Sequence, residues 1–236
     1  MDLGLHRRVA VVTAASKGLG RATALALAAE GARIVLNARD ADALAAVADQ
    51  IEHAVVVPGD ITDPDLPARL VQAAMGRWGR VDVVVGNAGG PPTGRALDVT
   101  DEQILAAVNA NMLASVRLAR AAVPHMQAAG WGRIVFIASA TVRQPIPDLA
   151  LSNVARTALW AWTKTAAQDL AEYGITVNLA APGLHATDRL IERGVTGRTG
   201  EPAAFGKIVA FLCSEPAEFV NGAAIDVNGG AVVGLH

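Results

Sequence analysis

The feature that most constrains this chain is residues 8–31, where an apolar run, a glycine turn and a long alanine- and leucine-rich run follow one another. This order predicts a buried strand that leads directly into the first turn of a helix. The N–H groups and the positive dipole end of such a helix favour a phosphate group. Gly18 and Gly20 let the backbone approach that anion, while Ser16 and Thr13 add hydroxyls. The segment therefore predicts a phosphate site, although many such turns carry glycine for steric reasons alone.

Short β-branched runs alternate with long helical runs along the rest of the chain, which predicts one α/β domain over residues 1–236. We expect a doubly wound parallel sheet of about seven strands with helices on both faces, because runs such as VDVVVG and RIVFIA suit strands buried on both sides. The expected strands are 9–13, 33–37, 54–58, 81–86, 133–139, 176–180 and 224–227. The expected helices are 18–30, 41–50, 65–78, 101–129, 152–173 and 201–214. Ligands of such sheets bind beyond the carboxyl ends of the strands.

Composition excludes several classes of partner. With 52% hydrophobic and 18% charged residues, the chain has ample material for a core and enough apolar surface to favour self-association. A net charge of −2 gives no reason to expect nucleic acid or an anionic membrane as a partner. Cys213 is the single cysteine, which excludes an intrachain disulfide and suits a reducing cytoplasm. No signal peptide or membrane span is expected, nor a metal site, so we predict a cytoplasmic protein.

Further landmarks follow in order: TAASKGLG in the glycine turn, the Asp60-Ile61 pair, GNAG at 86–89, VNANMLASV around Asn111, IVFIASA ending near Ser139, and VNLAAPGLHAT at 177–187. In order and spacing, over essentially the whole chain, they resemble the short-chain dehydrogenase/reductase family, and within it the 3-oxoacyl-carrier-protein reductases. The resemblance implies a Rossmann-like fold, a nicotinamide dinucleotide cofactor and oxidoreductase activity on a carbonyl or alcohol. It implies cofactor contacts from Thr13, Ser16, Lys17, Gly18, Leu19, Gly20, Arg39, Asp60, Ile61, Asn87, Ala88, Gly89, Arg156, Pro182, Gly183, Leu184 and Thr187.

The charges around the second expected strand favour NADP(H) over NAD(H). Arg39 stands after that strand, where a 2′-phosphate needs a cation, and Lys17 of the glycine turn would approach the same phosphate from the other side. Two alternatives stay open: both cations are solvated surface residues, or the neighbouring Asp40 binds the ribose of NAD.

Ala14 departs from the family pattern, since it stands where the family has its first loop glycine. Alanine is tolerable there if the φ angle is negative.

The expected catalytic group is incomplete. In the family, a Tyr-x-x-x-Lys pair follows the serine by thirteen residues and supplies the proton; here Ser152 and Arg156 occupy those positions. The only tyrosine, Tyr173, lies about five helical turns further on, or ~30 Å. A serine hydroxyl cannot be tuned to exchange protons near neutrality, and an arginine stays charged. The candidate catalytic residues are therefore Ser139 and Asn111, which the chain keeps, with Ser152 and Arg156.

Three hypotheses follow. In the favoured one, the chain is an NADP-dependent oxidoreductase whose proton comes from water or from another residue such as His185 or Asp148. In the second, it binds NADP without redox chemistry, as a sensor or a non-catalytic subunit. In the third, the pocket serves another reaction, with Arg143 and Arg156 holding an anionic substrate such as a carboxylate, or a thioester. A small molecule, with anionic and acyl compounds among the candidates, is the expected substrate.

The segment after Thr187 is short for a family member and implies a brief lid over the substrate. The resemblance also implies a homotetramer formed through the two long helices and the last strand. Leu159, Trp160 and Trp162 fit burial in such an interface, or in an ordinary core.

Overall fold

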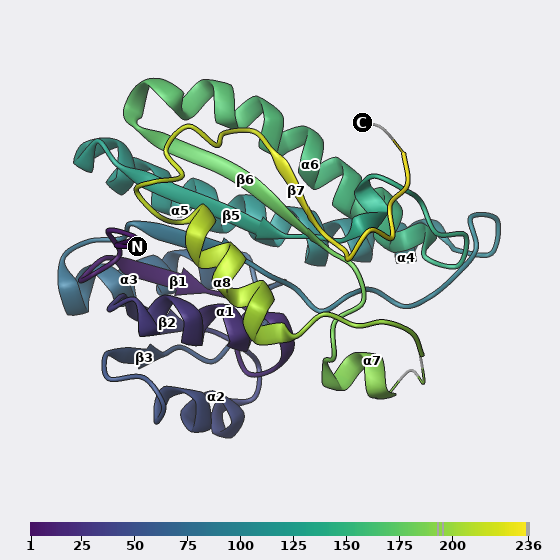
Figure 1. Cartoon of the computed structure of the whole chain (residues 1–236), viewed down its shortest axis with the longest axis horizontal. Helices are drawn as coiled ribbons and strands as arrows, with labels where there is room; N and C mark the ends of the chain where they lie inside the picture. The colour runs from purple at the N-terminus through teal and green to yellow at the C-terminus, as the bar shows by residue number, and fades with distance from the viewer. Residues whose placement is uncertain (193, 195, 235–236) are drawn as a thin grey trace.

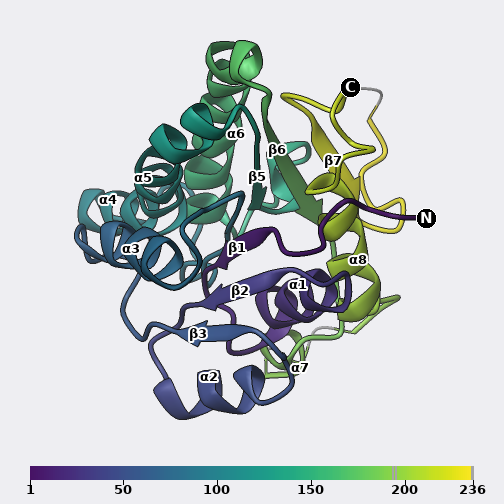
Figure 2. The same ribbon diagram turned by 90° about the vertical axis from the view of Figure 1, so that its left-hand side faces the viewer.

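Residues 1–192, 194 and 196–234, which the computed structural model describes, form a seven-stranded sheet with helices on both faces (Figures 1 and 2). Every strand pair is parallel. The strands are β1 (Val9–Val12), β2 (Arg33–Leu36), β3 (Ala54–Val56), β4 (Val83–Gly86), β5 (Gly132–Ile137), β6 (Ile175–Pro182) and β7 (Ala224–Val227). The helices are α1 (Gly18–Ala29), α2 (Ala41–Ala48), α3 (Leu66–Trp78), α4 (Asp101–Val108), α5 (Ala114–Ala129), α6 (Ala150–Leu170), α7 (Asp188–Glu192) and α8 (Pro202–Leu212). The predicted fold class is confirmed.

The strand order, β3-β2-β1-β4-β5-β6-β7, reverses direction between β1 and β4. The chain adds its first three strands toward one edge and the remaining strands toward the other. In a sheet of this kind the loops beyond the carboxyl ends separate at the reversal and leave a crevice there. The topology therefore places the glycine turn after β1 opposite the loops after β4 and β5.

Each face of the sheet has its own apolar core. On one face, Leu27 of α1, Leu44 of α2 and Phe205 of α8 are buried together. On the other face, Leu70 of α3 and Leu118 of α5 belong to the second cluster. Figure 2 shows α3, α5 and α6 on one side of the sheet and α1 and α8 on the other. The continuous apolar strands are thus buried on both faces, as their sequence predicted.

The predicted helix over residues 101–129 is present and contains a π-helical segment that was not predicted. Helix α4 ends at Val108, a π-helical segment covers Asn109–Leu113, and α5 continues from Ala114. The amide oxygen of Asn109 accepts a hydrogen bond from the Arg117 guanidinium at 2.7 Å. A π turn inserts an additional residue into a helix without ending it, so hydrophobic periodicity alone does not reveal it. The short α7 was also absent from the predicted elements.

Cys213, directly after α8, is fully buried, and this burial raises the pKa of its thiol to about 12. The thiol is therefore protonated at neutral pH and unreactive, as expected for a buried position. Among the described residues, no helix has the length and apolar character to cross a bilayer.

The condition under which alanine is tolerable at position 14 is not met: the φ of Ala14 is +47°, in the left-handed region that glycine tolerates best. The loop is closely packed at this point, because a Cβ atom at Gly20 would come within 2.2 Å of the Ala14 carbonyl oxygen. The alanine methyl group is therefore strained in this turn.

We expect Ala14→Gly to raise the free energy of unfolding by about 1 kcal/mol, because it relieves the strain of a left-handed alanine. The measurement is urea denaturation. Ala15→Gly is the matched control, since Ala15 is buried without a positive φ and should lose stability. A decrease for Ala14→Gly would contradict the prediction.

Candidate active site

A cleft of about 980 Å³ lies along the carboxyl ends of the strands. Its walls come from the glycine turn and from the loops that follow β2 to β6. This volume lies at the upper end of the range found for small-molecule and cofactor sites. The cleft has two parts, which we call the glycine-loop half (around Lys17, Arg39 and Asp60) and the serine half (around Asn111, Ser139, Ser152 and Arg156).

The glycine-loop half begins at the amino end of α1. Lys17 occupies the N-cap position with an extended backbone, and its side chain makes no capping hydrogen bond. Gly18 has a φ of +58° and lies beside Thr187, which its missing Cβ would approach to 3.5 Å. The first N–H groups of α1 therefore open onto the cleft, and Gly18 places no side chain in front of them.

Both cations predicted for a phosphate line this half of the cleft. The Lys17 ammonium lies 3.9 Å from the Glu192 carboxylate of α7, and the Arg39 guanidinium lies 4.0 Å from the Asp60 carboxylate. The Arg39 side chain is 83% exposed, so solvent screens its ion pair and leaves the guanidinium able to turn toward a ligand.

The two carboxylates near Arg39 have other partners. Asp40 caps α2 by accepting a hydrogen bond from the Ala43 N–H at 3.0 Å. Asp60 accepts from the N–H and the hydroxyl of Thr62, at 2.9 and 2.7 Å, and these hydrogen bonds hold the pKa of its carboxyl below the usual value. Asp40 thus acts as the N-cap of α2. This role weakens the alternative in which Asp40 binds the ribose of NAD.

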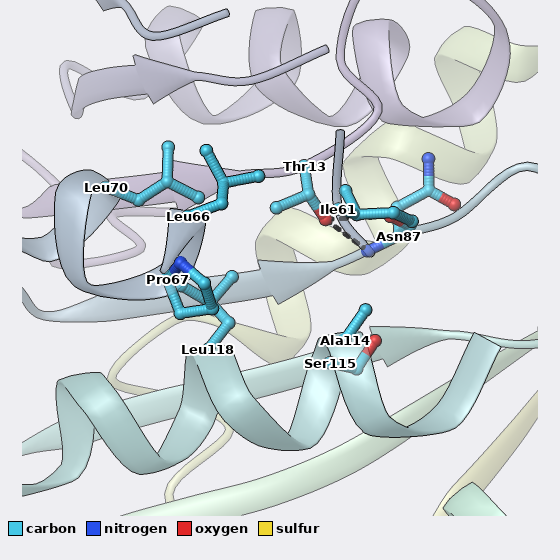
Figure 3. A pocket seen from close by; sticks show the side chains of 9 residues that line it. All are labelled: Thr13, Ile61, Leu66, Pro67, Leu70, Asn87, Ala114, Ser115 and Leu118. Atoms are coloured by element: carbon cyan, nitrogen blue, oxygen red, sulfur yellow. Dashed lines mark hydrogen bonds between the residues drawn. The ribbon is translucent and has the colours of Figure 1, made fainter. Parts of the chain in front are cut away.

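Two residues predicted for the cofactor support the cleft wall and do not line it. The Thr13 hydroxyl donates to the Asn87 carbonyl oxygen at 2.7 Å and accepts from the Asn87 N–H at 2.8 Å. Figure 3 shows this link beside a separate cavity of about 10 Å³, which is roughly the volume that one water requires. Gly20 is packed against Ala14. The other residues predicted for the cofactor all line the cleft.

The serine half is organised around one buried guanidinium. Arg156, on the second turn of α6, donates to the carbonyl oxygens of Ile137 and Ala138, both at 2.9 Å. It also donates to the side-chain oxygen of Asn111 at 3.1 Å, and only 6% of its surface is exposed. These contacts use at least two of the five N–H donors of the guanidinium. Arg156 therefore joins α6, the end of β5 and the π segment.

Two serine hydroxyls lie next to the Arg156 guanidinium. Ser139 follows β5, and its Oγ accepts a hydrogen bond from the Thr141 N–H at 3.2 Å. Ser152 lies one helical turn before Arg156 and also lines the cleft. With its Oγ already accepting a bond, Ser139 can direct its own O–H at an oxygen in the cleft.

The alternative proton donors are poorly placed. Tyr173 lies beyond the carboxyl end of α6, whereas Ser152 lies at the amino end. Asp148 is 73% exposed and faces Arg95 at 3.8 Å. His185 does line the cleft, but Nδ1 lies 3.2 Å from the Gly183 carbonyl oxygen and the ring packs edge-on against Phe205.

The structure contradicts the hypothesis that Arg143 grips a substrate. Its guanidinium donates to the Ala224 carbonyl oxygen at 2.9 Å, lies 3.9 Å from the Asp226 carboxylate and stacks 4.4 Å from the centre of the Trp160 ring. All three partners lie away from the described cleft lining. Arg143 therefore fastens the loop after β5 to α6 and β7.

Other lining residues escaped the sequence analysis. The Gly90-Pro91-Pro92 segment follows β4, and its place after a strand end was a usable signal. The alanine wall from α4 and the π segment carries no such signal, because only tertiary packing brings that helix across the start of α6. This wall comprises Ala106, Ala107 and Ala110.

A short chain dehydrogenase family model matches residues 8–195. The chain is 34% identical to dehydrogenase/reductase SDR family member 4 of Oryctolagus cuniculus, over 96% of this chain and 94% of that protein. It is 32% identical to a 3-oxoacyl-[acyl-carrier-protein] reductase of Synechocystis, over 97% and 98% of the two chains. Among solved structures, L-sorbose reductase from Gluconobacter frateurii, complexed with NADPH and L-sorbose, superposes with a TM-score of 0.94 at 31% identity, each chain being covered in full. This protein belongs to the short-chain dehydrogenase/reductase family.

Proposed function

We propose that the chain acts as one dinucleotide-binding domain and is an NADP(H)-dependent oxidoreductase of carbonyl or alcohol compounds. The observation that carries the cofactor preference is the position of Lys17 and Arg39 on the same half of the cleft, while Asp40 is engaged as a helix cap. The NADPH in the similar L-sorbose reductase supports the same choice.

The residues present fit such a cofactor. The cleft has the required volume, the amino end of α1 opens onto it, and the side chain that Gly89 lacks would point into open space. We assign the cofactor contacts to the lining residues of the glycine-loop half together with Asn87, Ala88, Gly89, Pro182, Gly183 and Leu184. When bound, NADP(H) supplies the hydride donor or acceptor.

In this proposal the chain's own residues polarise the substrate. Ser139 donates a hydrogen bond from its hydroxyl to the carbonyl oxygen, and Ser152 offers a second hydroxyl beside it. Arg156 contributes a fixed positive charge near the oxygen on which negative charge develops. Water supplies the proton, because neither Ser152 nor Arg156 can exchange one near neutrality. The absence of a tuned acid should cost roughly 10²–10⁴ in rate.

The second candidate is an NADP-binding protein that carries out no redox chemistry. The contacts of Arg156 favour it, since a guanidinium bonded to two backbone carbonyls and to Asn111 serves the architecture of the cleft. Tight NADPH binding without consumption by any carbonyl compound, also after mixing with active relatives, would support this candidate.

The homotetramer implied by the family resemblance remains a prediction. Leu159 is buried, Trp162 packs against Phe136 and Trp160 lies beneath Arg143, so these side chains are held by their own chain. The exposed apolar side chains include Val154 on α6 and, on α8 and the segment after it, Ile208, Phe211 and the fully exposed Phe219. The expected cytoplasmic location is likewise a prediction.

We expect Arg39→Asp to weaken NADPH binding by about 10- to 100-fold, because it replaces a charge-assisted contact with repulsion of the 2′-phosphate. NADH binding should change much less. Fluorescence titration of both coenzymes measures the difference. Arg77→Asp is the control, since this exposed residue of α3 carries the same charge outside the cleft. Equal weakening of NADPH and NADH would refute the 2′-phosphate assignment.

Introducing a tyrosine and a lysine at positions 152 and 156 should raise turnover. We expect Ser152→Tyr with Arg156→Lys to raise carbonyl reduction by about 10²–10⁴, the usual contribution of general acid catalysis. Ser152→Phe with Arg156→Lys is the matched control, because both variants lose the arginine contacts and only one gains a phenol. The assay is NADPH oxidation, with thermal melting of both variants as a check on folding. Identical rates in the two variants would show that the serine half cannot position a proton donor.

Light scattering at micromolar concentration tests the assembly. We expect a mass near four times 24.2 kDa, because the exposed apolar side chains favour self-association. A monomer would refute the tetramer without affecting the cofactor assignment.

A further inference from the structure

The serine half of the cleft contains a buried positive charge whose hydrogen-bond acceptors are neutral. Arg156 is 6% exposed and lines the cleft. The backbone oxygens of Ile137 and Ala138 and the amide oxygen of Asn111 accept its hydrogen bonds. These oxygens satisfy N–H groups of the guanidinium, but they carry no net charge. A buried charge is poorly screened by solvent, so Arg156 acts on whatever enters this half of the cleft.

The start of α6 adds to the positive potential at the same place. Leu151 and Ser152, in the first turn of this 21-residue helix, line the cleft, so the positive end of the helix dipole opens onto the serine half. The first turn contains no acidic residue that would offset it. His185 also lines the cleft, and taking up a proton could only make the site more positive.

The carboxylates of the cleft lie elsewhere or are screened. Among the lining residues that the structure describes, the acidic ones are Asp40, Asp60 and Asp188. Asp40 and Asp60 belong to the glycine-loop half, where Asp40 caps α2 and Asp60 faces Arg39. Asp188 begins α7 and is exposed, so water screens its charge. The serine half therefore has a net positive potential.

Under the proposed function, the nicotinamide ring of the coenzyme has to enter this half. Hydride transfer requires near contact between the ring and the carbon whose oxygen is bound by Ser139. The two oxidation states of the coenzyme differ at this end, because the ring of NADP⁺ is a cation and the ring of NADPH is neutral. The charge of Arg156 therefore opposes one oxidation state and not the other.

Ser152 leaves this opposition in place. A phenol at that position could release its proton beside a cation and become an anion, which would offset the charge of residue 156. A serine hydroxyl does not ionise near neutrality, and an arginine does not lose its proton there. The positive charge is therefore the same whichever form of the coenzyme is bound.

We propose that Arg156 makes the protein selective for the oxidation state of its coenzyme, so that it binds NADPH in preference to NADP⁺. The inference rests on the proposed function only for coenzyme binding, and it applies equally to an oxidoreductase and to a protein without redox chemistry. Repulsion between two unit charges a few ångströms apart, in a site shielded from water, is large enough to change a binding constant by about tenfold or more.

The preference has a different consequence for each candidate function. In an oxidoreductase it favours reduction of the substrate and release of NADP⁺, and a tenfold ratio of affinities raises the potential of the bound two-electron couple by about 30 mV. In a protein without redox chemistry it makes occupancy follow the ratio of NADPH to NADP⁺.

Isothermal titration of the unmodified protein with each coenzyme at one salt concentration is the first test. We expect NADPH to bind at least about tenfold more tightly than NADP⁺, a difference of about 1.4 kcal/mol. Equal affinities, or tighter binding of NADP⁺, would overturn the inference.

A negative charge beside the guanidinium should weaken the preference. Asn111→Asp is nearly isosteric and places a carboxylate where the amide oxygen now accepts from Arg156 at 3.1 Å. We expect it to lower the ratio of the two affinities by about tenfold, because the new ion pair cancels most of the local charge. Asn111→Leu, of similar size and neutral, is the matched control and should retain the preference. An unchanged ratio in Asn111→Asp would count against the inference.

Removal of the charge provides an independent variant. Arg156→Gln should lower the ratio by a similar factor, whereas Arg156→Lys should retain the preference because it keeps the charge. Arg120→Gln, which removes an exposed arginine of α5 outside the cleft lining, should leave the ratio unchanged. Thermal melting shows which variants are folded. A preference that persists in folded Arg156→Gln would overturn the role of Arg156.

The outcomes separate this inference from the proposed function. Absence of affinity for either coenzyme would refute the proposed function itself. Binding of both coenzymes with equal affinity would refute only the selectivity for the oxidation state.

Discussion

A buried positive charge at Arg156 is the constraint on which the cleft depends. A guanidinium removed from water is costly unless its N–H groups find acceptors, and here the end of β5 and Asn111 supply them. Three elements that are distant in sequence are fixed relative to one another by this single side chain. The hydroxyls of Ser139 and Ser152 take their positions from the same elements, so the polar end of the cleft is set before any ligand arrives.

A lysine paired with a tyrosine would combine two tasks, the stabilisation of negative charge and the transfer of a proton. This arrangement separates them. A fixed charge stabilises developing negative charge, but it cannot pass a proton on. Under the proposed function, Arg156 would supply the first capacity, and the second would have to come from water. Slow reduction with water as the acid, and coenzyme binding without reduction, are both compatible with this chemistry, and they differ in a measurable rate.

The architecture was predictable because its causes are local in sequence. Apolar strands, glycine turns and amphipathic helices each leave a pattern in adjacent residues, and the strand and helix positions agree within a few residues. The features that escaped prediction have distant causes. Ala14 has its positive φ where its carbonyl oxygen packs against Gly20, Arg143 is directed by its contacts with β7 and Trp160, and the π segment from Asn109 accompanies contacts with Arg117 and α6. The loop residues that share the cleft were predictable from the strand ends. The hydrogen bonds that these residues already make within the protein were not predictable.

The π segment between α4 and α5 also has a consequence for how one helical run can serve two environments. Each residue of an α-helix turns the side-chain direction by about 100°, so one additional residue rotates everything beyond it by nearly a third of a circle. Ala106 and Ala107 before the segment can thus line the cleft, while the stripe after it, with Leu118 and Met126, meets the sheet. A deletion of one residue between 109 and 113 would rotate one of these faces relative to the other by about 100°. Either the cleft wall or the packing against the sheet would then be lost.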